Sequence, residues 1–423
     1  MATLRPIIYN LHRLIDRCTS PSPTGVDRVD LHYAQFILQK AQERPIYFLR
    51  QRQNVSYLVP FKQAASLINT LEKRWLQGLK LPQAPIINTS YDYLRHWPAT
   101  RFRQQRQLLI DPALRHHLSH STKPPIYLHS GHGTLHHIDL HEQIKTQLQA
   151  DMLYYLHDLI PIEFPEYTNH PNALAMHQRR LKTMATTGRL ILANSEDSRQ
   201  KLLAYCQQHQ LPQPEVQVLF IGVEELFIKA AQQAKQPIPS RFATLAQSPY
   251  FLTIGTVEAR KNHLLLLHLW RQLFAELGEH CPKLVILGKR GWKAEHIFHL
   301  LDSSPALQQT VIEIQDANDQ EMLSLIQNTQ ALLFPSFAEG WGMPLAEALT
   351  LNTKAICSDL PALRECGRTQ SLYLNPLDGL AWKAAILNAL SEPPQLKQAY
   401  LPDRWEDHLQ KLDELLISLE AKS

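Results

Sequence analysis

Cysteine is scarce in this chain of 423 residues, and its five cysteines contain no CxxC pair (Cys18, Cys206, Cys281, Cys357 and Cys366). So sparse and odd a number argues against a disulfide framework and favours a reducing cytosol. No apolar run reaches the roughly 18 residues that a membrane span needs. Charges and a histidine interrupt the apolar part of "MATLRPIIYNLHRLID", so we expect no secretory signal. Short fixed-period repeats and low-complexity tracts are also absent.

What is present is the composition of an ordinary globular protein, with 44% hydrophobic and 19% charged residues. The length suggests two domains. Charge is unevenly placed: residues 1–240 hold 27 Lys and Arg against 18 Asp and Glu, and the remainder holds 16 against 21. The basic half could face an anionic membrane, nucleic acid or glycan, or it could be a solvated surface without a partner.

Short apolar runs alternate with helical patterns in both halves, which indicates βαβ units and parallel sheets. The first half offers "RPIIYNL", "RPIYFLR", "PPIYLHS", "DMLYYLHDLI", "GRLILANS" and "VQVLFIG" as strands. Helices are expected in "GVDRVDLHYAQFILQKAQ" and in "NSEDSRQKLLAYC", where Ser195 is a candidate N-cap. The stretch "SLINTLEKRWLQGLKLP" reads as a basic amphipathic helix that could lie on an anionic membrane or pack on the sheet.

Apolar periodicity is lost near residues 229–248, which we interpret as an interdomain linker. A second alternating series follows, with "YFLTIGT", "PKLVILG", "TVIEIQDA", "ALLFPS" and "KAICSD" as strands. The intervening helices are expected in "NHLLLLHLWRQLFAEL", "EMLSLIQNT" and "MPLAEALTL", and a final one in "WEDHLQKLDELLISLEA". Two doubly wound domains of this kind bind ligands at the carboxyl ends of their strands, so two substrates could meet in a cleft between them.

The segment "FAEGWGMPLAEAL" places Glu339 and Glu347 on either side of a glycine turn that leads into a helix, with Pro344 at its expected first position. A helix N-terminus there favours a phosphate, and glycines allow the backbone to approach a ligand closely. Glu347 could accept hydrogen bonds from a diol such as a ribose, and Glu339 would face the reacting group. On this segment alone, ordinary capping by acids near a helix start explains the pattern equally well.

The segment "FLTIGTVEARKNHLLLL" places Arg260 and Lys261 between a strand that ends at Gly255 and the start of a helix. The helix dipole disfavours cations at this position, so their presence favours a functional role. Adjacent cations at a strand's carboxyl edge can bind a diphosphate and neutralise its charge as it leaves.

Taken together, "IGTVEARKNH", "PSFAEGWGMPLAEAL" and "ICSDLPALREC" resemble the retaining glycosyltransferases of family four, whose signature is two glutamates with seven residues between them. The similarity is strong from about residue 250 to 366 and weaker in the N-terminal half. It implies an α/β fold of the GT-B type, with two doubly wound Rossmann-like domains facing across a cleft. Residues 1–235 would form the acceptor-side domain and 236–400 the nucleotide-sugar domain, with 401–423 packing back toward the N-terminal domain.

The resemblance also implies roles for individual residues. Arg260 and Lys261 would hold the nucleotide diphosphate, Glu347 the ribose, and Glu339 the donor sugar. The backbone of the turn would line the sugar and phosphates (Gly340, Trp341, Gly342, Met343 and Pro344). Two departures are Ala259, where the family often has proline, and "LGKRGW" in place of a GxG motif, which leaves the contacts to the base open.

The N-terminal half contributes "LHDLIPIEFPEY", where His157 would contact the donor sugar near its anomeric carbon or be a structural histidine. In "SPSPTGVDRVDLHYA", Gly25 would let the backbone approach donor or acceptor, and Arg28 follows at a helix start. The cluster "YLHSGHGTLHHID" (His129, His132, His136 and His137) could bind sugar hydroxyls or pack internally. It lacks a well-spaced carboxylate or cysteine to complete a metal site, so no metal or other cofactor is expected.

The resemblance is greatest to bacterial mannosyltransferases of surface polysaccharide synthesis, which suggests transfer of mannose from GDP-mannose, with retention, to a glycan or lipid-linked glycan. We expect a cytoplasmic protein that could touch the inner face of the membrane, with no nucleic-acid partner. Alternatives are a UDP- or dTDP-sugar donor, a nucleotide-sugar epimerase of the same fold, and a non-catalytic glycan-binding or scaffold relative. The epimerase is disfavoured by the glutamate pair, and the scaffold by the presence of Glu339, Arg260 and Lys261 together.

Overall fold

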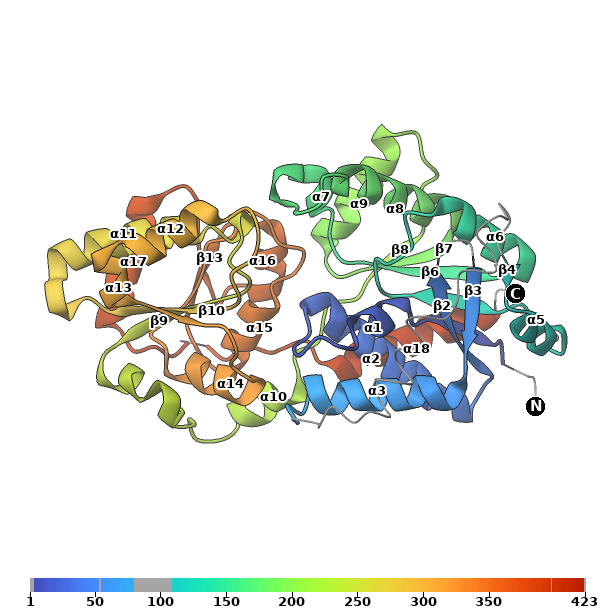
Figure 1. The fold of residues 1–423 in the computed structure, drawn as a ribbon, viewed down its shortest axis with the longest axis horizontal. Coiled ribbons are helices and arrows are strands. Elements are labelled where there is room, and N and C mark those ends of the chain that lie inside the picture. The colour runs from blue at the N-terminus through green and yellow to red at the C-terminus, as the bar shows by residue number, and fades with distance from the viewer. Residues whose placement is uncertain (1–3, 53–54, 80–108, 397, 422–423) are drawn as a thin grey trace.

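The structure, a computed structural model, describes residues 4–52, 55–79, 109–396 and 398–421. It consists of two α/β lobes side by side, each built on its own sheet (Figure 1). Among the helices of the described ranges, none is both long enough and apolar enough to span a bilayer.

The N-terminal lobe has a sheet of order β4-β3-β2-β1-β5-β6-β7-β8, parallel except for the β2–β3 pair. Its strands are β1 (Ile7–Asn10), β2 (Ile46–Arg52), β3 (Val55–Val59), β4 (Leu109–Ile110), β5 (Ile126–His129), β6 (Asp151–Leu156), β7 (Gly188–Ala193) and β8 (Val216–Val218). All six strands predicted in this half are present. The antiparallel β3 and the short β4 were not predicted.

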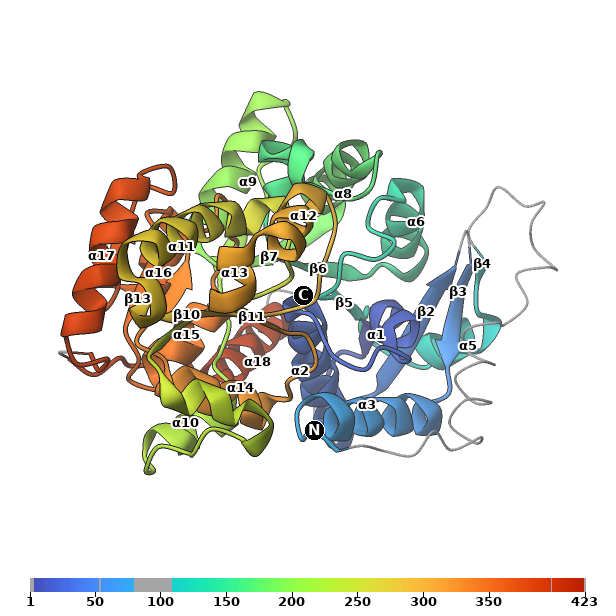
Figure 2. The ribbon, with the colours of Figure 1, turned by 60° about the vertical axis from the view of Figure 1, so that its left-hand side comes forward.

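Helices cover both faces of this sheet (Figures 1 and 2). One face carries α1 (His12–Arg17), α2 (Gly25–Gln39), η1 (Lys40–Gln42) and α3 (Phe61–Trp75). The other carries α5 (Pro112–Ser119), α6 (Ile138–Leu148), α8 (Ala173–Thr187) and α9 (Glu196–Gln208). The short α7 (Ile160–Glu163) and η3 (Pro165–Tyr167) lie between β6 and α8.

The C-terminal lobe has the parallel strand order β11-β10-β9-β12-β13-β14. Its strands are β9 (Tyr250–Ile254), β10 (Lys283–Leu287), β11 (Val311–Ile314), β12 (Leu332–Phe334), β13 (Ala355–Ser358) and β14 (Leu372–Leu374). The order reverses between β9 and β12, which is the position where doubly wound sheets bind their ligands. The strands predicted for this half are therefore confirmed, together with a parallel GT-B-like arrangement.

Helices again lie on both faces of the C-terminal sheet (Figures 1 and 2). One face carries α11 (His263–Leu277), η6 (Gly278–His280), α12 (Glu295–Ser303), α13 (Pro305–Thr310) and α17 (Gly379–Ser391). The other carries α14 (Asp319–Asn328) and α15 (Met343–Thr350). The short η5 (Ala259–Lys261) precedes α11, and α16 (Pro361–Gly367) follows β13.

Local sequence explains where several helices begin. Thr24 caps α2 and forms a reciprocal capping box with Asp27, and Asn318 does the same with Glu321 at α14. The predicted N-cap Ser195 is confirmed, since its side chain accepts a hydrogen bond from Ser198 N. One boundary was misplaced: α15 starts at Met343, so Pro344 is its second residue, because the left-handed Gly342 (φ 117°) already supplies the N-cap.

The chain crosses between the lobes twice, and the crossings run side by side. The first leads from β8 to α10 (Glu225–Ala231) through Gly222 and Val223, whereas the linker predicted near residues 229–248 covers the end of α10 and η4 (Ser240–Gln247). The second leads into α18 (Trp405–Ala421). Val223 N donates to Asp403 O at 2.8 Å, and a Cβ on Gly222 would lie 2.2 Å from Trp405 N. Glycine at position 222 is therefore required for the crossings to pass so closely.

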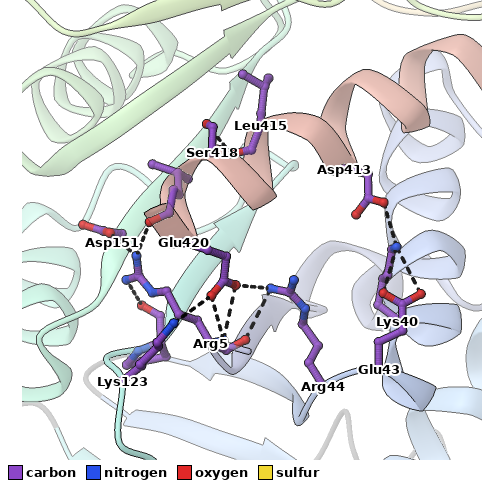
Figure 3. Close-up of polar contacts among 12 residues, drawn as sticks. Arg5, Lys40, Glu43, Arg44, Lys123, Asp151, Asp413, Leu415, Ser418 and Glu420 are labelled. Carbon is purple, nitrogen blue, oxygen red and sulfur yellow. Dashed lines mark hydrogen bonds and ion pairs between the residues drawn. The ribbon is translucent and has the colours of Figure 1, made fainter. Parts of the chain in front are cut away.

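The final helix α18 returns to the N-terminal lobe. It buries Leu412 and Leu416 in the same core as α2. At its end, Glu420 accepts hydrogen bonds from the backbone amide of Arg5 (3.1 Å) and from the Arg44 side chain (2.8 Å), as Figure 3 shows. The end of α18 is thus fixed to the amino-terminal edge of the first sheet.

The membrane alternative for the basic amphipathic stretch is not supported where the structure describes it. Helix α3 buries Leu67, Ile68, Leu71 and Trp75 against its own lobe. Its apolar face is therefore occupied by internal packing. Residues 80–82 of that stretch lie outside the described residues. The five cysteines are all free and buried.

Candidate active site

A cleft of about 690 Å³ lies between the carboxyl edges of the two sheets. It is lined from both lobes, and its wall includes every residue that the sequence singled out as catalytic or donor-binding: Gly25, His157, Arg260, Lys261, Glu339, Gly340, Trp341, Gly342, Met343, Pro344 and Glu347. The fold therefore brings these predicted residues together, although their individual roles remain predictions.

The core of the cleft is a cluster of two cations and one carboxylate whose side chains are 9–17% exposed. Glu339 lies after β12, and Arg260 and Lys261 lie after β9, the two strands at the switch point of the sheet. Lys261 Nζ is 2.6 Å from Glu339 Oε1, and Arg260 Nη1 is 2.9 Å from Glu339 Oε2. Arg260 also contacts Glu258 at 2.7 Å.

Charge pairing dominates the ionisation of this cluster. Burial acts to raise the pKa of Glu339, but the positive charges of Arg260 and Lys261 outweigh it and hold that pKa at about 2. Burial lowers the pKa of Lys261, and Glu339 counteracts this effect. Glu339 is thus the ionised counter-ion of two cations in a site that can exchange one anion for another.

The glycine turn brings the backbone of the C-terminal lobe against the N-terminal lobe. A Cβ on Gly340 would lie 2.3 Å from His157 O and 3.0 Å from Asp158 Cβ. Gly342 adopts a left-handed conformation, which L side chains rarely take. The Trp341 ring stacks on Phe220 at 4.8 Å and belongs to the core cluster that both lobes share.

His157 lies at the carboxyl end of β6 on the opposite wall. Its Nε2 is 2.7 Å from Ser130 O, a contact that requires a proton on Nε2 and leaves Nδ1 as an acceptor. Burial lowers the pKa of His157 to about 4, so the ring is neutral at pH 7. Its own carbonyl accepts from Asn194 Nδ2 at 2.6 Å. A neutral, fixed imidazole can accept from, or pack against, a sugar without adding charge.

Glu347 lies in a different electrostatic environment from Glu339. It is 5% exposed, and burial raises its pKa to about 8. The charge of Arg28 opposes this rise, whereas Asp319 and Glu224 add to it. Glu347 therefore holds a proton near neutral pH, and hydroxyl donors such as those of a ribose would stabilise its ionised form.

Arg28 is the cation whose charge lowers the pKa of Glu347, and it also joins the lobes. From α2 its Nη2 reaches the carboxylate of Asp319 on α14 at 2.8 and 3.0 Å. Its Nη1 lies 3.6 Å from Glu224 in the first crossing. Nearby, a Cβ on Gly25 would be 3.2 Å from Met343 Sδ. The "PTGVDR" segment thus contacts the C-terminal lobe as well as the cleft.

The "LGKRGW" segment also contributes to the interface. A Cβ on Gly288 would lie 2.0 Å from Gly255 O, so glycine is required where the ends of β9 and β10 meet. Trp292 donates to Tyr167 O at 3.1 Å and Lys293 to Glu166 O at 2.9 Å. Leu287, Gly288 and Lys289 line the cleft, Trp292 contacts the other lobe, and Arg290 pairs with Asp302 and Glu313 of its own lobe.

The four histidines of "YLHSGHGTLHHID" do not form one cluster. His129 stacks on His141 at 5.6 Å, His132 lies edge-on to His157 at 4.8 Å, and His136 contacts His137 at 4.0 Å. Within the described ranges, no group of three or more His, Cys, Asp or Glu side chains is arranged to hold a metal ion.

Sequence reasoning missed residues that depend on the other lobe. Asp319, Glu224 and Asn194 surround the site without belonging to any of the motifs. Ser195 was predicted as a cap, and its hydroxyl also donates to Gly340 O of the opposite lobe at 3.0 Å. Polar residues directly after predicted strands were the only signal that could have found Asn194 and Ser195.

Comparison with known proteins places this geometry in context. Residues 234–400 match the model of the family described as "Glycosyl transferases group 1". The serotype-specific mannosyltransferase WbdA of Escherichia coli is 32% identical over 133 residues, which is 31% of this chain and 16% of that protein. The O-antigen chain mannosyltransferase B of Escherichia coli is 26% identical over 237 residues, 56% of this chain and 60% of that protein. The chain thus spans less than two thirds of both relatives.

Solved structures match over nearly the whole chain. The trehalose 6-phosphate synthase of Burkholderia multivorans gives a TM-score of 0.61 at 14% identity, covering 99% of this chain and 98% of that one. The sucrose-phosphate synthase of Thermosynechococcus elongatus gives 0.60 at 14% identity, covering 99% and 100%. At this identity the likeness shows the fold, which is GT-B.

Proposed function

This chain has the GT-B fold and resembles mannosyltransferases of the group 1 glycosyltransferases, and from that premise we propose that it transfers a hexose from a nucleotide sugar to a glycan. The observation that carries the proposal is the pairing of Arg260 and Lys261 with Glu339 at the switch point, opposite His157. Two adjacent cations with one exchangeable counter-ion suit a diphosphate, which carries more charge than the carboxylate it would displace.

The residues suggest a division of labour. Arg260 and Lys261 would stabilise the leaving diphosphate, and Glu339, released from them, would hold hydroxyls of the donor sugar. Glu347 would accept from the ribose. The bond from the anomeric carbon to the phosphate oxygen breaks as the acceptor oxygen bonds to that carbon from the same face, and the acceptor proton passes to the leaving phosphate. Retention is proposed from the resemblance, and metal independence from the two cations that supply the positive charge.

Mannose from GDP-mannose is our proposed donor, on the likeness to mannosyltransferases and on the "HDLIPIEFPEY" segment. The proposed acceptor is a glycan or lipid-linked glycan of a surface polysaccharide. The second candidate is the same chemistry with a UDP- or dTDP-sugar, since the base end of the cleft, near Lys289, departs from the family's glycine pattern. Contact with a membrane surface stays a prediction of the charge asymmetry alone.

The test is calorimetric titration with GDP, UDP, ADP and dTDP in the presence of a chelator. We expect GDP to bind best, and Arg260→Ala to weaken it about thirtyfold, the effect of losing charge-assisted hydrogen bonds worth about 2 kcal/mol. The exposed Arg271→Ala on α11 is the matched control and should bind as the wild type does. A preference for UDP would replace the mannose proposal, and no binding would favour the non-catalytic alternative.

Turnover is tested with Glu339→Gln. We expect this variant to lose transfer by at least about a hundredfold, because the donor sugar loses a charged acceptor, while GDP binds at least as tightly as before. Nucleotide binding is retained because, without the Glu339 carboxylate, nothing competes with the diphosphate for Arg260 and Lys261. Unchanged turnover in Glu339→Gln would remove the role assigned to this residue.

A further inference from the structure

The N-terminus of helix α9 is capped by a side chain from the opposite lobe. Glu365, on α16 of the C-terminal lobe, accepts from Glu196 N at 2.6 Å and from Asp197 N at 2.8 Å. These are the first two amides of α9, which have no partner within their own helix. The third, Ser198 N, is satisfied by the N-cap Ser195 at 3.1 Å.

The acidic residues of α9 itself do not compete for these amides. Glu196 pairs with Arg199 at 2.7 Å, and Asp197 pairs with Lys201 at 2.8 Å, both on the same helix. The first-turn carboxylates are therefore directed along the helix surface. A carboxylate at a helix N-terminus is favourable, and here it is supplied by a residue 169 positions away.

This cap lies next to the turn that carries Glu339. Ser195 Oγ lies 3.0 Å from Gly340 O, and Asn194, one residue earlier, donates to His157 O at 2.6 Å. The amino end of α9 thus contacts the donor-side turn, the strand end of His157 and Glu365. Glu365 itself is not part of the cleft wall.

We propose that Glu365 is a positioning residue whose carboxylate, by capping α9 across the lobe interface, holds the Glu339–Gly340 turn against His157 in the state that performs transfer. The two hydrogen bonds from the α9 amides to Glu365 exist only when the lobes are together. Losing them leaves two amides and a half-buried carboxylate without partners, so the closed arrangement becomes less populated. The catalytic consequence rests on the proposed function, whereas the cap itself does not.

Hydrogen exchange tests the cap directly. In Glu365→Ala, peptides covering residues 196–198 should exchange about tenfold faster than in the wild type, because their amides lose charge-assisted acceptors. Glu365→Gln keeps one carbonyl acceptor without the charge and should lie between the two. The matched control is Asp359→Asn, whose exposed carboxylate pairs with Arg364 of α16 and does not contact α9.

Kinetics with GDP-mannose then separate positioning from donor binding. We expect kcat to fall about tenfold in Glu365→Ala, with the Kd for GDP unchanged, since the nucleotide contacts lie in the C-terminal lobe. Small-angle scattering should give a larger radius of gyration for this variant. Unchanged exchange at residues 196–198 would overturn the cap, and faster exchange with unchanged kcat would overturn the positioning role.

Failure of the proposed function would be recognised separately. If the wild type transfers no sugar from any of the corresponding nucleotide sugars, the proposed function fails, and the cap is judged by exchange and scattering alone. Faster exchange together with a larger radius of gyration in Glu365→Ala would then support interlobe positioning. A radius of gyration equal to that of the wild type would overturn it.

Discussion

Two glutamates eight positions apart, Glu339 and Glu347, have pKa values that are shifted in opposite directions in this protein. Burial disfavours the charge of both. Glu339 contacts two cations, which hold its pKa at about 2, whereas Glu347 has two acids near it beside the single Arg28, and its pKa rises to about 8. At the residue scale, the charge of each carboxyl group therefore depends on neighbours that come from other parts of the chain.

A stability measurement checks the state of Glu347. Its pKa is higher in the folded protein than in the unfolded chain, so the folded state binds the proton more tightly and the free energy of unfolding falls as pH rises from about 4.5 to about 8. Glu347→Gln removes this fall in the free energy of unfolding, because glutamine does not ionise. We expect it to match the wild type near pH 4.5 and to be more stable by on the order of 3 kcal/mol at pH 8, measured by urea unfolding.

The exposed Glu279→Gln serves as the control for that experiment and should follow the wild type at both pH values. A Glu347→Gln variant whose stability relative to the wild type did not change with pH would show that Glu347 titrates normally. The proposed ribose contact would then lose its electrostatic argument.

At the element scale, capping chemistry and tertiary contact act together. Helices α2 and α14 begin at capping boxes that their own sequences provide. Helix α18 is instead fixed at its far end by Glu420, which contacts Arg44 at 2.8 Å and the amide of Arg5 (Figure 3). These partners come from the amino-terminal part of the chain, so the last helix joins the first strand to the second crossing.

Glu420→Ala should therefore lower stability without altering the cleft. Arg44 is almost completely buried and would be left without this carboxylate, at a cost of about 2–3 kcal/mol. We expect a lower Tm and an unchanged Kd for GDP. Glu414→Ala, at an exposed position of the same helix, should leave the Tm within about a degree of the wild type. Equal Tm values for the two variants would refute the anchoring role.

At the scale of the whole molecule, the described ranges are in a closed arrangement in which the lobes contact each other around the cleft. Arg28 reaches Asp319, Trp292 reaches Tyr167, and Glu365 reaches α9. At Gly340 the backbone leaves no room for a side chain beside His157. Lobe closure and assembly of the site are thus the same event.

Gly340→Ala should prevent that event. The added Cβ would lie 2.3 Å from His157 O, so the lobes must separate. We expect transfer to fall at least about a hundredfold, with GDP binding retained and a larger radius of gyration in scattering. Gly379→Ala is the control, because its Cβ would meet Leu265 at an ordinary 3.6 Å. Wild-type turnover in Gly340→Ala would mean that transfer does not need this contact.

The amino-acid sequence is enough to predict the alternation of strands and helices, since buried parallel strands appear as short apolar runs and helices carry their own caps. It also determined the residues that gather at the carboxyl edges, because motifs that follow strands share that edge. The folded structure is needed to see that Glu339 is neutralised by Arg260 and Lys261, that Glu347 is not neutralised to the same extent, and that Glu365 caps α9. Lys261 and Glu339 are 78 residues apart in the chain, and Glu365 is 169 residues from Glu196, whose amide it accepts from. Pattern and propensity act within a few residues, whereas charge pairing and interlobe contact depend on distances that folding alone creates.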